Sequence, residues 1–280
     1  GFYTLMLGAS DMGTGCDTTL AQIAADVLGC DLDNIVSHGV DTDVSPYDSG
    51  SYASSTAYLT GMAAVKASKS MIRLITEKGA EYLEKTPEEV EFDGERVMAK
   101  DGSAAISLKD IGNRAMANNG KALEVTESHS SPVSPPPFMA GAAEVEVDME
   151  TGQIDLIQFV SAVDCGTPLN ENLARVQTEG GLVQGIGMAL YEDVTYLKNG
   201  HVCENSLMQY KLPTRLDIGR VQVELECSYE PTGPFGAKSI GEIVINTPSP
   251  AIANAVYNAV GVRIRELPIT AEKIFNGLNQ

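Results

Sequence analysis

Apolar and polar positions at the start of the chain predict a strand, a turn and a helix, in that order. Residues 2–8 are rich in β-forming side chains, and residues 11–15 form a glycine-punctuated stretch typical of a turn. Residues 18–28 carry apolar side chains at helical spacing, and Gly29 marks the end of that helix. A second strand is expected over residues 34–40, before a polar loop.

A long helix is predicted over residues 54–78, and its start is built from small residues. Ala53, Ser54, Ser55 and Thr56 have short side chains, so a ligand can approach the free backbone N–H groups there. The plain interpretation of these residues is a helix cap rather than a nucleophile or a ligand site.

Short strands and turns are expected over residues 86–100, and Ser107 is expected to cap a short helix that reaches Ala117. Successive prolines in residues 131–137 cannot join a central sheet and favour an extended linker. We therefore expect one subdomain over residues 1–131 and a second over 138–280.

The second half of the chain mixes hairpin and helix patterns without strict strand–helix alternation. A hairpin is predicted from residues 142–148 and 153–163, and a further strand from 221–227. Helices are predicted over 173–189 and 248–260. The expected fold class is α+β, with mixed sheets and packed helices.

Composition narrows the functions that the chain can have. Its 280 residues carry a formal net charge of −19, which argues against a nucleic-acid partner, because phosphate binding draws on clustered Lys and Arg. No apolar run approaches the roughly 20 residues that a membrane span needs, and no signal peptide is recognisable. A cytoplasmic location is expected. The chain begins without Met, which suggests a processed or partial chain.

Cysteines and histidines give no metal-binding pattern. The five cysteines contain no Cys-x-x-Cys pair, so ordinary reduced thiols are expected rather than a disulfide framework, a zinc site or an iron–sulfur cluster. Cys16, beside the glycines of the first turn, is a possible cofactor contact. His38, His129 and His201 have no metal-ligand spacing and are expected at the surface or in strands.

A glycine loop before a helix can cradle a phosphate group, and Gly8, Gly13 and Gly15 have that placement. The spacing fits neither a P-loop, which needs Gly-Lys-Ser/Thr, nor the dinucleotide-binding Gly-x-Gly-x-x-Gly. A tight turn and an anion site both remain open for this loop.

Glu242 is the most unusual carboxylate in the sequence. It follows a run from Gly233 that supplies three glycines and few charges, so it is presented on a permissive loop. Its apolar neighbours Phe235, Ile240 and Ile243 are expected to desolvate the carboxylate and make it a stronger base. A general base and an ordinary surface glutamate are equally compatible with these residues.

A set of short motifs lies in order along nearly the whole chain. The motifs are Asp11-Met-Gly-Thr-Gly15, Leu20-Ala-Gln-Ile-Ala-Ala25, Thr42-Asp-x-x-Pro-Tyr47, Gly50-Ser-Tyr-Ala-Ser54, Val183-Gln-Gly-Ile-Gly187, Gly233-Pro-Phe-Gly-Ala-Lys238, Gly241-Glu242, Ala251-Ile-Ala-Asn-Ala255 and Arg263-Ile-Arg-Glu-Leu-Pro268. This set resembles the molybdenum-binding subunit of the xanthine dehydrogenase and aldehyde oxidase family.

This resemblance implies a molybdenum–molybdopterin cofactor, in the cytosine dinucleotide form, with the metal held through the pterin rather than by side chains. It implies that Glu242 is the base in a hydroxylation whose oxygen comes from water, and that Gln184 hydrogen-bonds a ligand of the metal. Residues 53–56 would contact the metal centre and pterin. Gly13, Thr14 and Gly15 would face the pterin or its phosphate. Many members of the family have Gln where this chain has the shorter Thr14.

The resemblance also implies parts that lie outside this sequence. Two iron–sulfur clusters and FAD would sit on partner subunits, and the N-terminal half of the molybdenum subunit would complete the cofactor site. This chain resembles the C-terminal part, as in relatives whose molybdenum subunit is split between two polypeptides. The expected substrate is a purine, another N-heterocycle or an aldehyde. A non-catalytic scaffold subunit and an independent nucleotide-binding protein are the alternatives.

Overall fold

Two compact units make up the chain in a computed structural model that describes residues 2–279. The first unit comprises Gly1–Pro135 and Tyr229–Lys238, and the second comprises Pro136–Ser228 and Ser239–Gln280. The short segment Tyr229–Lys238 therefore packs with a part of the chain from which it is distant in sequence. Among the described residues, no helix is both long enough and apolar enough to cross a membrane.

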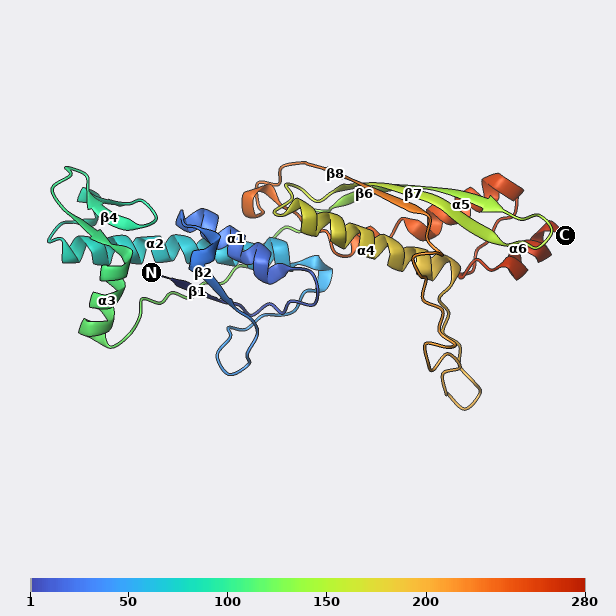
Figure 1. The fold of residues 1–280 in the computed structure, drawn as a ribbon, viewed down its shortest axis with the longest axis horizontal. Coiled ribbons are helices and arrows are strands. Elements are labelled where there is room, and N and C mark those ends of the chain that lie inside the picture. The colour runs from blue at the N-terminus through green and yellow to red at the C-terminus, as the bar shows by residue number, and fades with distance from the viewer. Residues whose placement is uncertain (1, 280) are drawn as a thin grey trace. The chain divides into compact units, whose positions relative to one another are not determined.

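The first unit begins with a strand, a helix and a parallel strand. Strand β1 (Tyr3–Met6) pairs with β2 (Ile35–His38), and α1 (Cys16–Leu28) connects them together with a short turn, η1 (Leu32–Asn34). Gly29 closes α1 in a left-handed conformation, and its N–H donates to the carbonyl oxygen of Ala25, as expected for a helix-ending glycine. Helix α1 packs against α2 (Gly61–Tyr82), the long helix of this unit (Figure 1).

The far end of α2 supports a second small sheet. Strands β3 (Val90–Phe92), β4 (Arg96–Ala99) and β5 (Ala105–Ser107) pair in sequence order, after the turn η4 (Pro87–Glu89). Helix α3 (Leu108–Asn119) follows, and the Ser107 hydroxyl accepts a hydrogen bond from the Asp110 N–H at 3.1 Å, which confirms the predicted cap. Ile75 of α2, Val97 and Ile111 form the centre of this core.

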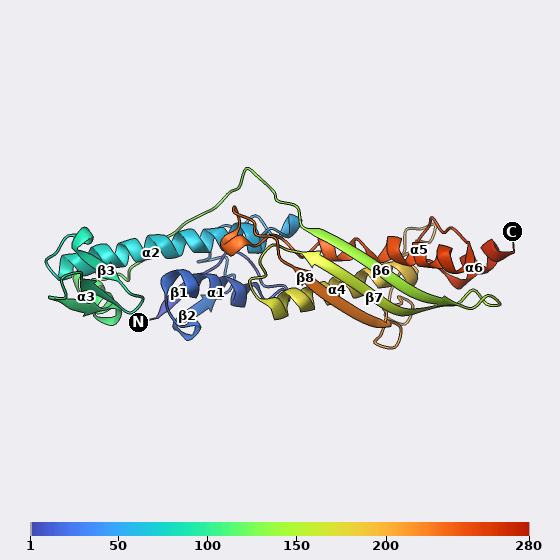
Figure 2. The ribbon, with the colours of Figure 1, turned by 90° about the horizontal axis from the view of Figure 1, so that it is seen from above.

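In the second unit, three strands carry two helices (Figure 2). Strands β6 (Phe138–Val147) and β7 (Ile154–Asp164) form the predicted hairpin, and β8 (Arg220–Glu226) pairs with β7 in parallel. A bulge in β7 leaves Ile157 unpaired, because Glu144 lies opposite Gln158 whereas Val145 lies opposite Leu156.

Helices α4 (Glu171–Leu190) and α5 (Pro248–Val260) pack on this sheet around one apolar core. Phe159 lies at its centre and is fully buried with Leu182 and Ile186 of α4 and Ile252 of α5. A further helix, α6 (Ala271–Leu278), adds Ile274 to the same core.

The α+β class with mixed sheets is confirmed, since parallel and antiparallel pairs coexist with separate helices. The predicted helix start at Ser54 is wrong in detail. Residues Tyr52–Ser54 form a single 3-10 turn (η2), Thr56–Thr60 form a π-helical turn (η3), and the regular α2 begins only at Gly61. The sequence patterns did not predict helix α6.

Candidate cofactor-binding and catalytic site

The start of α2 has an unusual backbone. Ala53 and Ser54 both have left-handed backbone angles, with φ of 52° and 55°, although neither is a glycine. Such angles cost free energy and cluster at functional sites. The π turn that follows has no side-chain cap, and single π turns also occur frequently at functional sites. This segment also presents small side chains, as the sequence predicted.

The glycine-rich segment Tyr229–Lys238 of the same unit contacts the π turn Thr56–Thr60 and the start of α2. The Tyr58 hydroxyl is hydrogen-bonded to the Thr232 hydroxyl at 2.6 Å and to the Ser131 hydroxyl at 3.1 Å. A side chain on Gly61 would meet Pro234 Cγ at 2.9 Å, so the helix and the loop approach closely. The structure thus brings Tyr58 and Gly61, which follow the family motif at residues 50–54, against the motif that begins at Gly233.

Strain recurs in that loop. Phe235, within the 3-10 turn η5 (Pro234–Gly236), has a left-handed φ of 53°. Lys238, at the end of the segment, is buried, with 7% of its surface exposed. Two strained non-glycine turns, one at Ala53 and one at Phe235, therefore belong to the same compact unit.

The glycine loop before α1 is organised by a carboxylate of its own. Asp11 accepts hydrogen bonds from the N–H groups of Gly13 at 2.9 Å, Gly15 at 3.1 Å and Asp17 at 3.4 Å. Burial acts to raise the pKa of Asp11, but the backbone N–H donors outweigh it and hold that pKa below its usual value. These amides are already satisfied, so the structure does not favour an independent phosphate site in this loop.

Cys16 begins α1 and is buried. Burial, assisted by the negative charge of Asp11, raises the pKa of this thiol to about 11, which makes the thiolate scarce at neutral pH. Cys16, Asp11 and Asp17 are close enough to surround an ion. A protonated thiol and a carboxylate committed to backbone donors are poor metal ligands, so this group does not carry a metal site.

In the second unit, Glu242 stands directly before the 3-10 turn η6 (Ile243–Ile245) and is exposed. Its neighbours Ile240 and Ile243 pack beneath the loop with the buried Val163 and Val244. The expectation that these apolar residues cover the carboxylate is wrong for this chain. They anchor the loop instead, and the carboxylate is presented to the outside.

Helix α4 packs closely against η6, the 3-10 turn that directly follows Glu242. A side chain added to Gly181 would meet Val244 Cγ2 at 2.1 Å, and one added to Gly185 would meet Pro248 Cγ at 2.6 Å. Only glycine permits this approach of helix and turn. Gln184 lies between these two glycines in sequence and is exposed. The structure therefore places Gln184 and Glu242 on contacting elements of one unit.

Sequence reasoning missed two residues that shape the site. Asp11 was treated only as part of a motif, although an aspartate two residues before a glycine is a familiar signal for a side-chain hydrogen bond to the backbone. Tyr58 gave no such signal, because its partner Thr232 lies 174 residues away. The Ser55 hydroxyl donates to the carbonyl oxygen of Gly50 at 3.4 Å rather than to a histidine.

The sequence matches the family described as "Molybdopterin cofactor-binding domain" over residues 1–219. It is 36% identical to the probable hypoxanthine oxidase XdhD of Escherichia coli strain K12, covering 100% of this chain and 29% of that protein. It is 33% identical to subunit gamma of the 6-hydroxypseudooxynicotine dehydrogenase complex of Paenarthrobacter nicotinovorans, covering 100% of this chain and 37% of that subunit.

Solved structures agree with these relatives. The fold is similar to that of the Cu,Mo-CO dehydrogenase, with a TM-score of 0.83 and 27% sequence identity over 98% of this chain and 35% of the other. The chain thus spans 29% to 37% of the length of these similar proteins. From its sequence and its fold, the chain belongs to the molybdopterin cofactor-binding family of the xanthine dehydrogenase type.

Proposed function

We propose that this chain is the cofactor-binding and catalytic part of a molybdenum hydroxylase. The reaction is the hydroxylation of an electron-poor carbon of a purine, another N-heterocycle or an aldehyde, with oxygen taken from water. The observation that carries the proposal is Glu242, an exposed carboxylate on a turn locked against the Gln184 helix by glycine contacts, in a chain of this family.

The residues present fit an anionic pterin cofactor. Residues 53–56 combine small side chains with left-handed backbone angles at Ala53 and Ser54, and the π turn that follows has no side-chain cap, so a ligand can approach the backbone of this segment closely. Ala53, Ser54, Ser55 and Thr56 would hold the cofactor in this way. Gly13, Thr14 and Gly15 would contact it by van der Waals approach, because Asp11 already accepts from the loop amides and a side chain on Gly13 would meet no atom within 4 Å.

Gln184 and Glu242 would act on the reacting side of the cofactor. The Gln184 amide can donate to and accept from ligands of the metal, and so can orient them. The Glu242 carboxylate can accept the proton that water loses as its oxygen is transferred, and a positioned base of this kind contributes roughly 10²–10⁴-fold to a rate. The bound molybdenum centre would supply Lewis acidity and accept the two electrons of the oxidation.

The finer assignments follow from the same proposal. The cofactor is the cytosine dinucleotide form of molybdopterin, and electrons leave through iron–sulfur clusters and FAD on partner subunits. The rest of the molybdenum subunit completes the substrate pocket, and the complex is cytoplasmic. The relative from Paenarthrobacter nicotinovorans is itself a subunit of a dehydrogenase complex, which supports a multi-subunit assembly.

Replacement of Glu242 by Gln in the intact enzyme complex tests the catalytic role. Gln keeps the size of the side chain and removes the base, so we expect turnover to fall by roughly 10²–10⁴-fold with the molybdenum and pterin contents unchanged. Glu266→Gln, at another exposed loop glutamate, is the matched control and should keep full turnover. Retained turnover in Glu242→Gln would favour the alternative, a non-catalytic scaffold subunit.

Steady-state assays of the wild-type complex with xanthine, nicotinate and simple aldehydes identify the substrate class. Metal and pterin analysis of the same preparation tests cofactor binding directly. A folded complex that lacks both molybdenum and pterin but binds a simple nucleotide would contradict the proposal.

A further inference from the structure

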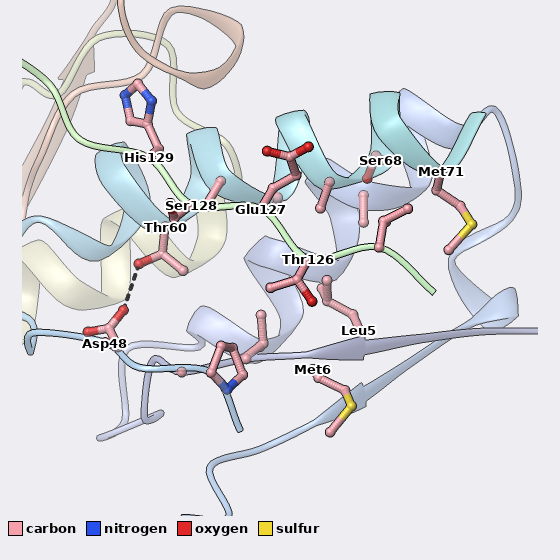
Figure 3. Close-up of a pocket in the computed structure, with 18 of the residues that line it drawn as sticks. Leu5, Met6, Asp48, Thr60, Ser68, Met71, Thr126, Glu127, Ser128 and His129 are labelled. Atoms are coloured by element: carbon pink, nitrogen blue, oxygen red, sulfur yellow. Dashed lines mark hydrogen bonds between the residues drawn. The ribbon is translucent and has the colours of Figure 1, made fainter. Parts of the chain in front are cut away.

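A groove within the first unit runs along one side of β1, and Ser55, at one end of the segment assigned above to the cofactor, is among its lining residues. It encloses about 520 Å³ and is lined by all of β1, by the start of α2 and by residues 123–129 (Figure 3). In the close-up, Leu5 and Met6 lie on one side, and Thr126 and Glu127 lie across from them. We call this space the edge groove.

The edge groove coincides with an open sheet edge. Strand β1 pairs only with β2 among the described residues. The N–H of Leu7 donates to the carbonyl oxygen of His38 at 3.3 Å. Because successive residues of a strand point their backbone groups to opposite sides, Thr4 and Met6 direct their N–H and C=O groups away from β2.

A two-stranded parallel sheet is incomplete by the usual standards of protein structure. Parallel sheets are normally buried on both faces, and pairs of strands rarely suffice for stability. Here Thr4 and Met6 are exposed on β1, and Val36 of β2 has 52% of its surface exposed. An unpaired strand edge beside a groove is the arrangement that accepts an added strand.

Unsatisfied polar groups also line the edge groove. The hydroxyl of Tyr3 and both ring nitrogens of His129 are buried without a hydrogen-bond partner. Burial, with the nearby Lys66, lowers the pKa of His129, so its ring is neutral and offers one donor and one acceptor. Buried polar atoms normally find partners, and a peptide backbone supplies both kinds.

The charge of the lining argues against a phosphate-rich occupant. Asp48, Glu124 and Glu127 line the edge groove, while the groups that line it include no Lys or Arg. An anionic cofactor would be repelled by these carboxylates. A neutral backbone in an extended conformation would not be.

We propose that the edge groove receives an extended segment from the remainder of the molybdenum subunit, which pairs with β1 as a third strand. The inference rests on the proposed place of this chain in such a subunit. The similar proteins support the choice of occupant, because this chain covers only 29% of XdhD and 37% of the gamma subunit. In those proteins, most of the polypeptide lies outside the matched region and is present in the same molecule.

Hydrogen exchange in the intact complex tests the pairing without reference to turnover. We expect the Thr4 and Met6 amides to be protected to the same extent as the Leu5 amide, which β2 already holds. Exchange of Thr4 and Met6 at the rate of an open chain, with Leu5 still protected, would overturn the proposal. Since the readout is independent of the cofactor, a complex without activity can still show the protected strand.

A pair of substitutions at Thr4 tests whether a third strand pairs with the open edge of β1. Thr4→Pro removes the outward N–H and places a ring against the incoming strand, whereas Thr4→Val keeps the N–H and a β-branched side chain. In the complex, Thr4→Pro should raise the exchange rate of the Met6 amide by roughly 2- to 10-fold, and Thr4→Val should leave it unchanged. Equal exchange in the two variants would contradict a third strand.

A photoreactive amino acid at position 4 then identifies the occupant. Crosslinks from position 4 to the remainder of the molybdenum subunit support the proposal. Crosslinks to a second copy of this chain, or the absence of any crosslinked peptide, overturn it.

Discussion

Adjacent glycines on α4 allow the contact between this helix and the Glu242 turn to be tested by one methyl group. A methyl on Gly181 would lie 2.1 Å from Val244 Cγ2 and 3.0 Å from Val244 Cβ, whereas a methyl on Gly180 would meet no atom within 4 Å. Val244 is fully buried, so it has little room to move. Gly181→Ala and Gly180→Ala are therefore a matched pair in one helix.

The two substitutions share one effect and differ in another. Ala stabilises a helix interior by about 0.8–1.0 kcal/mol relative to Gly, and this gain applies at both positions. Non-bonded carbons prefer a separation of about 3.5–4.0 Å, so the methyl on Gly181 requires the Val244 turn to shift by more than an ångström. Overpacking of this kind costs about 1–3 kcal/mol. The difference between the variants should equal that cost, since the helix gain cancels.

Native-state hydrogen exchange of α4 and of residues 243–245 in the intact complex measures the free energy of local opening for each variant. Gly180→Ala should raise this free energy by about 0.8–1.0 kcal/mol relative to wild type. The value for Gly181→Ala should lie about 1–3 kcal/mol below that for Gly180→Ala. We also expect Gly181→Ala to lower turnover, because the shifted turn carries Glu242. Equal opening free energies in the two variants would refute the close contact of helix and turn.

Three further predictions concern the first unit. Tyr58→Phe removes the hydrogen bond to the Thr232 hydroxyl and should lower the free energy of unfolding of the first unit by about 0.5–1.5 kcal/mol. Urea unfolding measures this free energy. An unchanged unfolding midpoint would show that the hydrogen bond does not stabilise the unit. Because the folded-state pKa of Asp11 is lowered, its stabilisation is fully present above the ordinary aspartate pKa and is lost as pH falls through the lowered value. Asp11→Asn should therefore flatten the dependence of the thermal midpoint on acidic pH, and an unaltered slope would argue against the role of Asp11. Because burial raises the pKa of the Cys16 thiol to about 11, Cys16 should react with iodoacetamide at neutral pH far more slowly in the folded chain than in urea. The exposed Cys227 serves as the reactive reference. Equal reaction rates for Cys16 in the folded chain and in urea would contradict its burial.

Local patterns predicted the regular elements well. The Gly29 helix end, the Ser107 cap and the β6–β7 hairpin each follow from residues close together in sequence, and the structure confirms them. The same local reasoning did not anticipate α6, an eight-residue helix that follows a proline-containing loop. Short helices of this kind depend on packing, here of Ile274 against the core of the second unit.

Long-range contacts could not be derived from spacing. Tyr58 of the π turn and Gly61 at the start of α2 contact a loop more than 170 residues away, and no nearby residue encodes that contact. For the same reason, Glu242 was expected beneath its apolar neighbours. Ile240 and Ile243 turn instead toward Val163 of β7, a partner that the local sequence does not reveal.

The proposed role of Glu242 is tested most directly by a single-turnover measurement on the Glu242→Gln complex. Substrate is mixed with the oxidised complex, and the reduction of its cofactors is followed, with Glu266→Gln and wild type loaded to the same molybdenum content. We expect the rate to fall by roughly 10²–10⁴-fold in Glu242→Gln alone. A Glu242→Gln complex that is reduced at the wild-type rate would contradict the assignment of Glu242 as the base.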